Sequence, residues 1–350
     1  MHSLSNIGDA FTLPAPAIDV ETAQRLVHDH YGISGVVQRL TGERDQNFRI
    51  RSGQGHDYLL KISHPAEDRS MTEFQTQALL HIMRTDPTLP VPHVIETRDG
   101  ESEKFLAIDG HAPRVVRLLS YLQGDLLPMV PRSSELRQHM AATLARLAIA
   151  LRGFFHPAAG HDLPWDLKHA GDLRDLLAHI PDMRQRSLAE RFLDGFEEHA
   201  RPQLSRLRAQ VVHNDLNDYN VLVDPAHHDR VAGILDFGDM VHTALINDLA
   251  IASSYQLTDS SDPLGTVAEF VAAYHAVLPL EPMEIDVLFD LMATRLVSVV
   301  AIGGWRAQQH PENRDYILRN NAKSWARLER CGALPRAQAR QTLRRACNME

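Results

Sequence analysis

The feature that most constrains the fold is a short polar cluster between two apolar runs, at residues 211–237. The chain reads VVHNDLNDYN, resumes with the apolar VLVD, turns at PAHHDR and returns as VAGILDF. Apolar, β-branched runs joined by turn residues predict a β-hairpin with a loop of about six residues. Folding the chain at this turn places Asp224 opposite Val231, and Asn220 opposite Leu235 or Asp236.

This hairpin brings two oxygen-bearing side chains to one place. Cross-strand neighbours lie ~5 Å apart, so the Asn220 amide oxygen and the Asp236 carboxylate can reach one shared centre. Amide and carboxylate oxygens are ligands that suit Mg²⁺. Asp215, upstream in the same loop, can accept a proton from an attacking hydroxyl group. Asn217 and Asp218 are interpreted as loop residues whose side chains stabilise the turn.

The chain changes character near residue 125. Before it, we expect a loosely held arm at residues 1–19, a helix from residue 20 with Asp19 as N-cap and Gly32 as its stop, and a second helix over 68–84. The expected strands of this part are 36–40, 47–52, 57–63, 93–97, 105–109 and 114–122. After it, helical patterns cover 133–154, 185–200, 265–277, 284–303 and 313–330, and only one strand pair, at 219–237, interrupts them. The 350 residues therefore predict two lobes, the first rich in strands and the second in helices.

Composition excludes several classes of protein. The formal net charge of −9 argues against a general nucleic-acid binder, although a local cationic pocket can still bind a nucleotide. The only cysteines, Cys331 and Cys347, build neither a disulfide framework nor a metal site. The N-terminus lacks the pattern of a signal peptide. We therefore expect a cytoplasmic protein. No apolar run is long enough to span a bilayer. The basic C-terminal sequence RAQARQTLRRAC is interpreted as a solvated helix face.

The motifs HNDLNDYNVLV and GILDFGD carry a family resemblance. They resemble the catalytic loop and metal-binding segment of the protein-kinase-like fold, and more closely those of the aminoglycoside phosphotransferase and choline kinase branch. Together with RLLSYLQGDLL and WDLKHAGDLRDLL, they are similar to the hydroxylysine kinase group, over residues from about 35 to 330.

The resemblance implies a bilobal α+β fold of the protein-kinase-like type. Its small N-terminal lobe, at residues 20–117, would hold an antiparallel β-sheet with one or two helices and bind the nucleotide. An interlobe hinge would follow at 118–124. The large, mainly α-helical C-terminal lobe, at 125–350, would carry the catalytic β-hairpin and bind the acceptor substrate.

The resemblance also assigns roles to single residues. Asp215 would be the catalytic base, Asn220 and Asp236 would be the metal ligands, and Lys61 would contact the phosphates of the nucleotide. Glu73, one helix later, would pair with Lys61 and orient it.

Further residues would support the catalytic loop and the phosphates. His213 would brace the loop through a hydrogen bond, whereas Asp248 would either tie the loop from below or cap a helix. The phosphate loop TGERDQNFRI holds one glycine rather than several, so it is either a plain hairpin turn or a source of nucleotide contacts. The candidate contacts in it are Arg44, Gln46 and Asn47.

The expected function is that of a small-molecule kinase. With Mg²⁺ as cofactor, it would transfer the γ-phosphate of ATP or GTP to a hydroxyl group of an amino alcohol or hydroxy amino acid, and 5-hydroxylysine is the acceptor expected first. Asp239 and Arg295 are candidate contacts for the ammonium and carboxylate groups of that acceptor. Two alternatives stay open: an aminoglycoside, homoserine or choline-like kinase of the same fold, and a catalytically silent kinase fold that serves as a binding protein. No nucleic-acid or membrane partner is expected.

Overall fold

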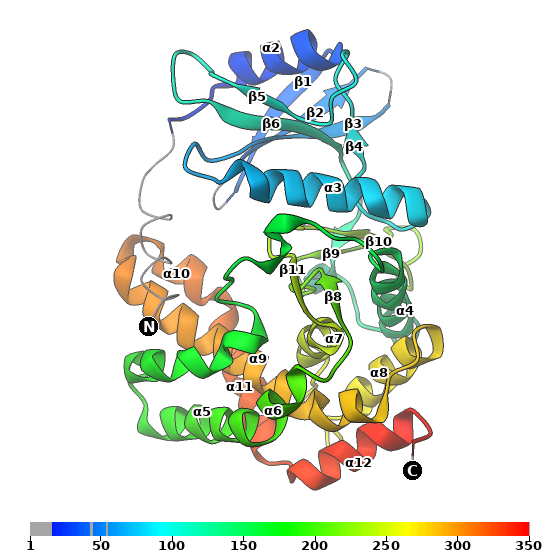
Figure 1. Cartoon of the computed structure of the whole chain (residues 1–350), viewed down its shortest axis with the longest axis vertical. Coiled ribbons are helices and arrows are strands. Elements are labelled where there is room, and N and C mark those ends of the chain that lie inside the picture. Colours follow the sequence, from blue (N-terminus) through cyan, green and yellow to red (C-terminus); the bar gives the residue numbers. More distant parts are fainter. Residues whose placement is uncertain (1–15, 43–44, 54, 350) are drawn as a thin grey trace.

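The computed structural model describes residues 16–42, 45–53 and 55–349, so most of the expected N-terminal arm lies outside the described residues. The described residues form two lobes, with a sheet and two helices in the upper one and a mainly helical body below (Figure 1). The predicted order, strands first and helices afterwards, is therefore present.

The first helix, α2 (Val20–Tyr31), begins and ends at the residues that the sequence predicts. The Asp19 carboxylate accepts a hydrogen bond from the Thr22 backbone N–H at 2.7 Å and so caps the helix. Gly32 ends it with a φ of 70°, a left-handed conformation that glycine adopts at little cost.

The N-terminal lobe is built on one antiparallel sheet, in the order β1-β2-β3-β6-β4, with β5 paired to the same edge of β6 as β4. Helix α2 covers one face, where the alternate residues Phe48, Ile50, Leu60 and Ile62 are buried. The strands are β1 (Gly35–Leu40), β2 (Gln46–Ser52), β3 (Asp57–Ile62), β4 (Val94–Ile95), β5 (Lys104–Leu106) and β6 (Arg114–Ser120).

Helix α3 (Arg69–Thr85) lies on the other side of this sheet, between it and the C-terminal lobe (Figure 1). Its buried residues Phe74, Ala78, Leu79 and Ile82 recur at helical spacing, as predicted. They belong to the same continuous apolar cluster as the core of the C-terminal lobe. Helix α3 therefore joins the two lobes through one shared core.

The C-terminal lobe is organised around α9 (Pro282–Gln309), a helix of 28 residues that packs against α7, α11, α12 and η3.

Along the described stretches, none of the helices combines the length and the apolar character that crossing a membrane requires. The other helices of the lobe are α4 (Ser134–Ala150), α5 (Met183–Gly195), α6 (Arg201–Leu204), α7 (Leu245–Ser254), α8 (Gly265–Val277), α10 (Arg314–Ile317), α11 (Asn321–Gly332) and α12 (Arg336–Ala346). Shorter turns of 3₁₀- or π-helix are η1 (Leu127–Met129), η2 (Pro157–Gly160), η3 (Leu167–His179), η4 (Phe196–Ala200), η5 (Pro311–Asn313) and η6 (Leu318–Asn320).

The expectation of a single strand pair in this lobe is wrong. The predicted hairpin is present as β9 (Val221–Val223) and β10 (Val231–Ile234), and β7 (Asp125–Leu126) adds a third strand. A second sheet pairs β8 (Ala209–Val212) with β11 (Val241–Ala244). Each of its strands is only four residues long, too short for a clear alternation of polar and apolar residues.

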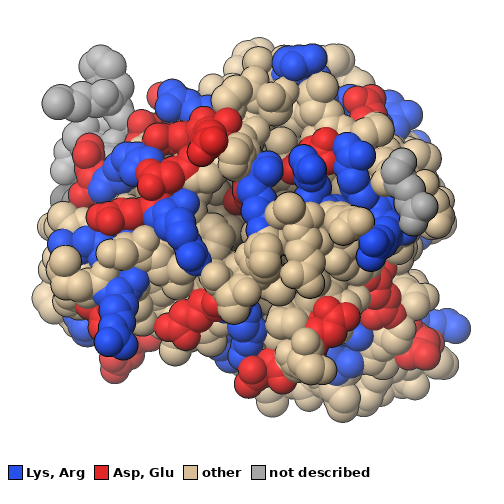
Figure 2. Space-filling view, turned by 90° about the horizontal axis from the view of Figure 1, so that it is seen from below, with Lys and Arg blue, Asp and Glu red and all other residues tan. Residues whose placement is uncertain are grey.

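The basic C-terminal helix α12 is also more than a solvated face. Arg344 forms a bidentate ion pair with Asp286 of α9, and both N···O distances are 2.7 Å. Arg336 binds Asp290 of α9, whose side chain is only 6% exposed. Burial raises the pKa of Asp290, and the Arg336 guanidinium opposes that rise. Seen from below, basic and acidic side chains are interspersed over this end of the molecule (Figure 2).

We expect the unfolding free energy of the Arg336→Ala variant to be lower by about 2 kcal/mol. This loss lies between the ~0–1 kcal/mol that an exposed ion pair contributes and the ~3–5 kcal/mol that is lost when a buried ion pair is broken. The reason is that Asp290 would remain buried without its partner. Urea unfolding measures the loss. The control Arg345→Ala, at an exposed position of the same helix, should change the value by less than ~0.5 kcal/mol. Equal losses in the two variants would mean that this ion pair does not stabilise the fold.

Candidate active site

The hairpin aligns Asn220 with Leu235, as the sequence predicts. The Leu235 backbone N–H donates to the Asn220 carbonyl oxygen at 2.8 Å. The expected pairing of Asp224 with Val231 is wrong by one residue, because Val231 lies opposite Val223. A bulge between Val231 and Gly233 inserts one extra residue, which restores the predicted register before the site is reached.

The segment of residues 213–220, called the polar loop below, is held from two sides. On one side the buried His213 places Nε2 2.9 Å from the Leu235 carbonyl oxygen, while its Nδ1 accepts from the Asp215 backbone N–H. On the other side Asp248, in the first turn of α7, accepts a hydrogen bond from the Asn214 backbone N–H at 2.8 Å. Of the two alternatives for Asp248, the structure therefore shows the tie to the loop.

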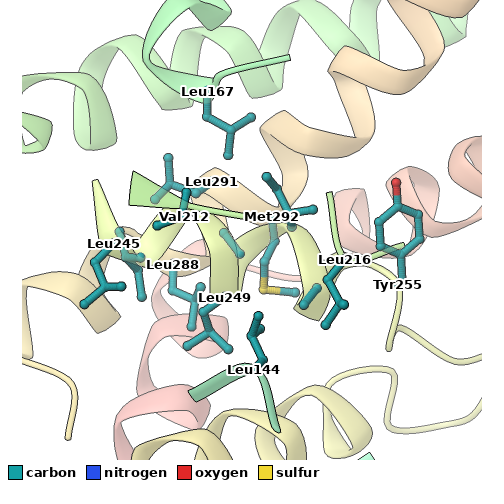
Figure 3. Packing of buried hydrophobic residues seen from close by; sticks show 14 of the residues in the cluster. Leu144, Leu167, Val212, Leu216, Leu245, Leu249, Tyr255, Leu288, Leu291 and Met292 are labelled. Carbon is teal, nitrogen blue, oxygen red and sulfur yellow. The ribbon is translucent and has the colours of Figure 1, made fainter. Parts of the chain in front are cut away.

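Leu216 anchors the polar loop in the apolar core. Its side chain is buried and lies in the cluster that also holds Leu249 of α7 and Met292 of α9, with Tyr255 at one edge (Figure 3). Because Leu216 follows Asp215 directly, its burial directs the neighbouring carboxylate towards the space between the lobes.

The Asp215 carboxylate is bound through both oxygens. Oδ1 lies 2.6 Å from Nη2 of Arg295, and Oδ2 accepts hydrogen bonds at 2.8 Å from the side-chain amides of Asn217 and Asn220. Burial raises the pKa of Asp215, and the Arg295 guanidinium opposes that rise. Asn217 thus does more than stabilise a turn, which the sequence reasoning missed.

Asn220 and Asp236 both offer an oxygen ligand to one cavity. Asp215 can only accept hydrogen bonds, so the Asn220 amide nitrogen must face it, and the Asn220 oxygen is left for another partner. Asp236 has a left-handed φ of 58° and an exposed side chain. Both residues line the same cavity of about 450 Å³ between the lobes, so their oxygens fit a Mg²⁺ ion that keeps several waters.

Lys61 enters this cavity from the N-terminal lobe. On β3 it lies opposite Asn47 of β2, and both residues line the cavity. Its Nζ lies 3.1 Å from Oδ2 of Asp45, a partner that the sequence reasoning did not consider. Asp45 also lines this cavity, so the ion pair lies within the cleft.

Two of the expected nucleotide contacts, Glu73 and Gln46, do not line this cavity. Glu73 is exposed on α3 and lines no part of the cavity, because Thr72 and Gln75, at other angles around the helix, face it instead. Gln46 bonds to Pro16 and to the Ile18 backbone N–H, since neighbouring strand residues point to opposite faces and Asn47 takes the cleft side. Arg44 lies outside the described residues.

A second cavity of about 560 Å³ continues the first one along the segment between the lobes. It shares Asn47, Lys61, Asn220 and Asp236 with the first, so the two form one cleft. Residues 120–124, which fall within the expected hinge, line one wall, and apolar side chains line much of the rest. A planar, partly apolar ligand with exposed polar edges suits such a wall. Its apolar lining includes Leu40, Leu59, Leu79, Leu119, Leu122, Leu222, Leu235 and Phe237.

Arg295 is the most distinctive group at the other end of the first cavity. Its side chain is only 4% exposed, and its guanidinium lies over the Trp165 ring at 5.3 Å. Among the described residues, Nε and Nη1 are buried and have no hydrogen-bond partner. Asp239 lines the same cavity, as do Arg306 and Arg319, which no motif in the sequence singled out.

The sequence is similar to those of known small-molecule kinases. The chain is 27% identical to the hydroxylysine kinase of Mus musculus over 337 residues, covering 90% of this chain and 89% of that one. It is 28% identical to the homoserine kinase of Methylobacillus flagellatus, covering 69% of this chain and 70% of the other.

Solved structures show the fold. An amicoumacin kinase superposes with a TM-score of 0.65 at 15% identity, covering 96% of this chain and 97% of that one. A microcompartment-associated aminopropanol kinase gives 0.62 at 21% identity, covering 94% and 99%. The predicted bilobal, protein-kinase-like α+β fold is thereby confirmed. The sequence also matches the phosphotransferase enzyme family over residues 36–285, well over half of its length, and the chain therefore belongs to that family.

Proposed function

We propose that this phosphotransferase is a small-molecule kinase that moves the γ-phosphate of ATP or GTP to the hydroxyl group of a small hydroxy amino acid, with 5-hydroxylysine as the first candidate. One observation carries the proposal. The carboxylate of Asp215 lies in one cleft with the oxygen ligands of Asn220 and Asp236. The same cleft holds the guanidinium of Arg295, two donors of which have no hydrogen-bond partner among the described residues.

Asp215 is the proposed base. Its two oxygens are fixed by Arg295, Asn217 and Asn220, so the carboxylate is preorganised and needs no rearrangement when a hydroxyl group arrives. Burial raises the pKa of Asp215 and so makes it a stronger base, while the Arg295 guanidinium favours its ionised form. The acceptor hydroxyl group would donate its proton to this carboxylate as its oxygen bonds to phosphorus.

The nucleotide would lie along the second cavity, with its base against residues 120–124 and its phosphates towards Lys61 and Asn47. Lys61 would exchange Asp45 for phosphate oxygens. The Asn220 oxygen and the Asp236 carboxylate would hold Mg²⁺, which supplies positive charge opposite the transferred phosphoryl group when bound.

The acceptor would occupy the end of the cleft beside Trp165. The free donors of Arg295 suit a carboxylate, and Asp239 suits an ammonium group, so the charges match an amino acid better than a polycationic antibiotic. The similarity to hydroxylysine kinases and homoserine kinases supports the same class, since both named substrates are hydroxy amino acids.

We expect Asp215→Asn to lower kcat by about 10²- to 10⁴-fold, because the proton acceptor is lost while the size and shape of the side chain are kept. Steady-state assays of product formation measure the effect. Asn217→Ala removes one contact to the base but not the base itself, so it should lower kcat far less. A variant Asp215→Asn with near-normal turnover would contradict the assignment.

Removal of divalent metal with EDTA should abolish turnover, and Mg²⁺ should restore it. In Asp236→Asn, the Mg²⁺ concentration for half-maximal rate should rise at least about tenfold, because the only carboxylate of the proposed metal pair is lost. Asp239→Asn is the matched control, three residues along the same segment, and should change the acceptor KM instead. An unchanged Mg²⁺ requirement in Asp236→Asn would place the metal elsewhere.

A panel of acceptors distinguishes the substrate classes. We expect turnover with 5-hydroxylysine or homoserine, and little with choline or an aminoglycoside, each tested with ATP and with GTP. Arg295→Lys should raise KM for the amino acids about tenfold or more, because a bidentate contact to a carboxylate is lost. Efficient phosphorylation of an aminoglycoside, without turnover of either amino acid, would favour the alternative acceptor class.

A further inference from the structure

A third cavity, of about 580 Å³, lies outside the interlobe cleft, with which it shares only Tyr255 among its lining residues. Its wall is basic: among the described residues that line it, Arg132, Lys323 and Arg327 are cations without an ion pair outside the cavity, and Asp218 is the only carboxylate. A fourth cation, Arg137, is already neutralised by an ion pair of 2.7 Å with a glutamate on α8. The cavity therefore has an excess of positive charge that the proposed phosphate transfer does not use.

The cations converge on one point. Arg132 places Nη2 2.6 Å from Oδ1 of Asp218, and Arg327 places Nη2 3.4 Å from Oδ2 of the same carboxylate. Both guanidinium groups also donate to the Tyr255 carbonyl oxygen at 3.1 Å. Lys323 lies one turn before Arg327 on α11, so the two side chains share a face of that helix. Two of the three cations thus contact one carboxylate, the third lines the same cavity, and an anion with two charges would balance the remaining positive charge.

The same contacts reach the polar loop. Asp218 lies three residues after Asp215 and two before Asn220, so the two arginines contact the polar loop through the Asp218 carboxylate. The Tyr255 hydroxyl oxygen lies 3.5 Å from Nη2 of Arg295, the nitrogen that pairs with Asp215. A change at either Asp218 or Tyr255 therefore acts on the residues proposed to bind the metal and accept the proton.

We propose that this third cavity is an inhibitory site for a phosphate dianion, either free inorganic phosphate or the phosphoryl group of a phosphorylated amino alcohol. Arginine forks bind phosphate oxygens in pairs, and a dianion would compete with the Asp218 carboxylate for Arg132 and Arg327. Lys323 would add a third contact. If the two ion pairs with Asp218 were lost, the polar loop would lose two contacts that hold it in place, and turnover would fall. The inhibitory part rests on the proposed kinase activity, whereas the binding part does not.

Equilibrium dialysis of the full chain with radiolabelled inorganic phosphate tests binding without any assay of activity. We expect one phosphate per chain to remain bound when Mg²⁺ and a non-hydrolysable nucleoside triphosphate analogue are present. Lys323→Gln should weaken that binding about fivefold, and Lys323→Glu should weaken it further. Arg345→Gln, which removes an exposed charge remote from the cavity, should leave it unchanged. Phosphate binding that is absent with the analogue, or insensitive to Lys323, overturns the site.

Initial rates test the inhibition. Inorganic phosphate should lower kcat without raising KM for nucleotide or acceptor. The Lys323→Gln variant should keep its kcat in the absence of phosphate and be less sensitive to inhibition by phosphate, since Lys323 touches no part of the proposed active site.

Phosphoethanolamine in a parallel series shows which source of phosphate binds better, with chloride at equal ionic strength as the control. Competition with nucleotide, or binding with no change in turnover, overturns the inhibitory role. A chain that phosphorylates none of the acceptors refutes the proposed function, while dialysis still tests the site.

Discussion

The geometry of the cleft depends on one buried carboxylate, that of Asp248. It accepts the Asn214 backbone N–H at a point where the chain adopts a left-handed φ of 65°, which a side-chain-bearing residue rarely does. Burial raises the pKa of Asp248, so the group is costly to place in the core, and the contact to the polar loop is part of what offsets that cost. Helix α7 thereby sets the path of the loop, and the loop sets the position of Asp215.

Charge pairing organises both ends of the cleft. Lys61 is paired with Asp45, and Arg295 is paired with Asp215. Each of these two cations thus has a protein carboxylate as its partner. Such pairs compensate charges that would be costly to leave unpaired in a partly buried cleft.

The sequence predicted the parts of the site that local patterns determine, and missed those that the tertiary fold determines. Asn220 meets Leu235 because alternation and turn residues set the register of a hairpin, and a bulge cancels the one-residue error at Asp224. The family resemblance assigned Glu73 as the partner of Lys61, but the shared core sets the angle around α3 and turns Gln75 to the cleft. The sequence reasoning also missed Arg306, Arg319 and Asp45. These residues lie on elements that are brought together only by the tertiary fold, and no spacing in the sequence predicts that contact. The short pairing of β8 with β11 was missed for the same reason, since about 30 residues separate the partners.

Helix α9 connects the cleft to the far end of the molecule. Arg295 lies roughly two and a half turns along it from Asp286, whose counterions come from α12. Shortening the chain before Arg336 would leave two carboxylates on α9 uncompensated and remove the apolar residues that cover it. The helix that carries the guanidinium beside Asp215 would then lose support, so tags and fusions are best attached beyond α12 with that helix kept whole.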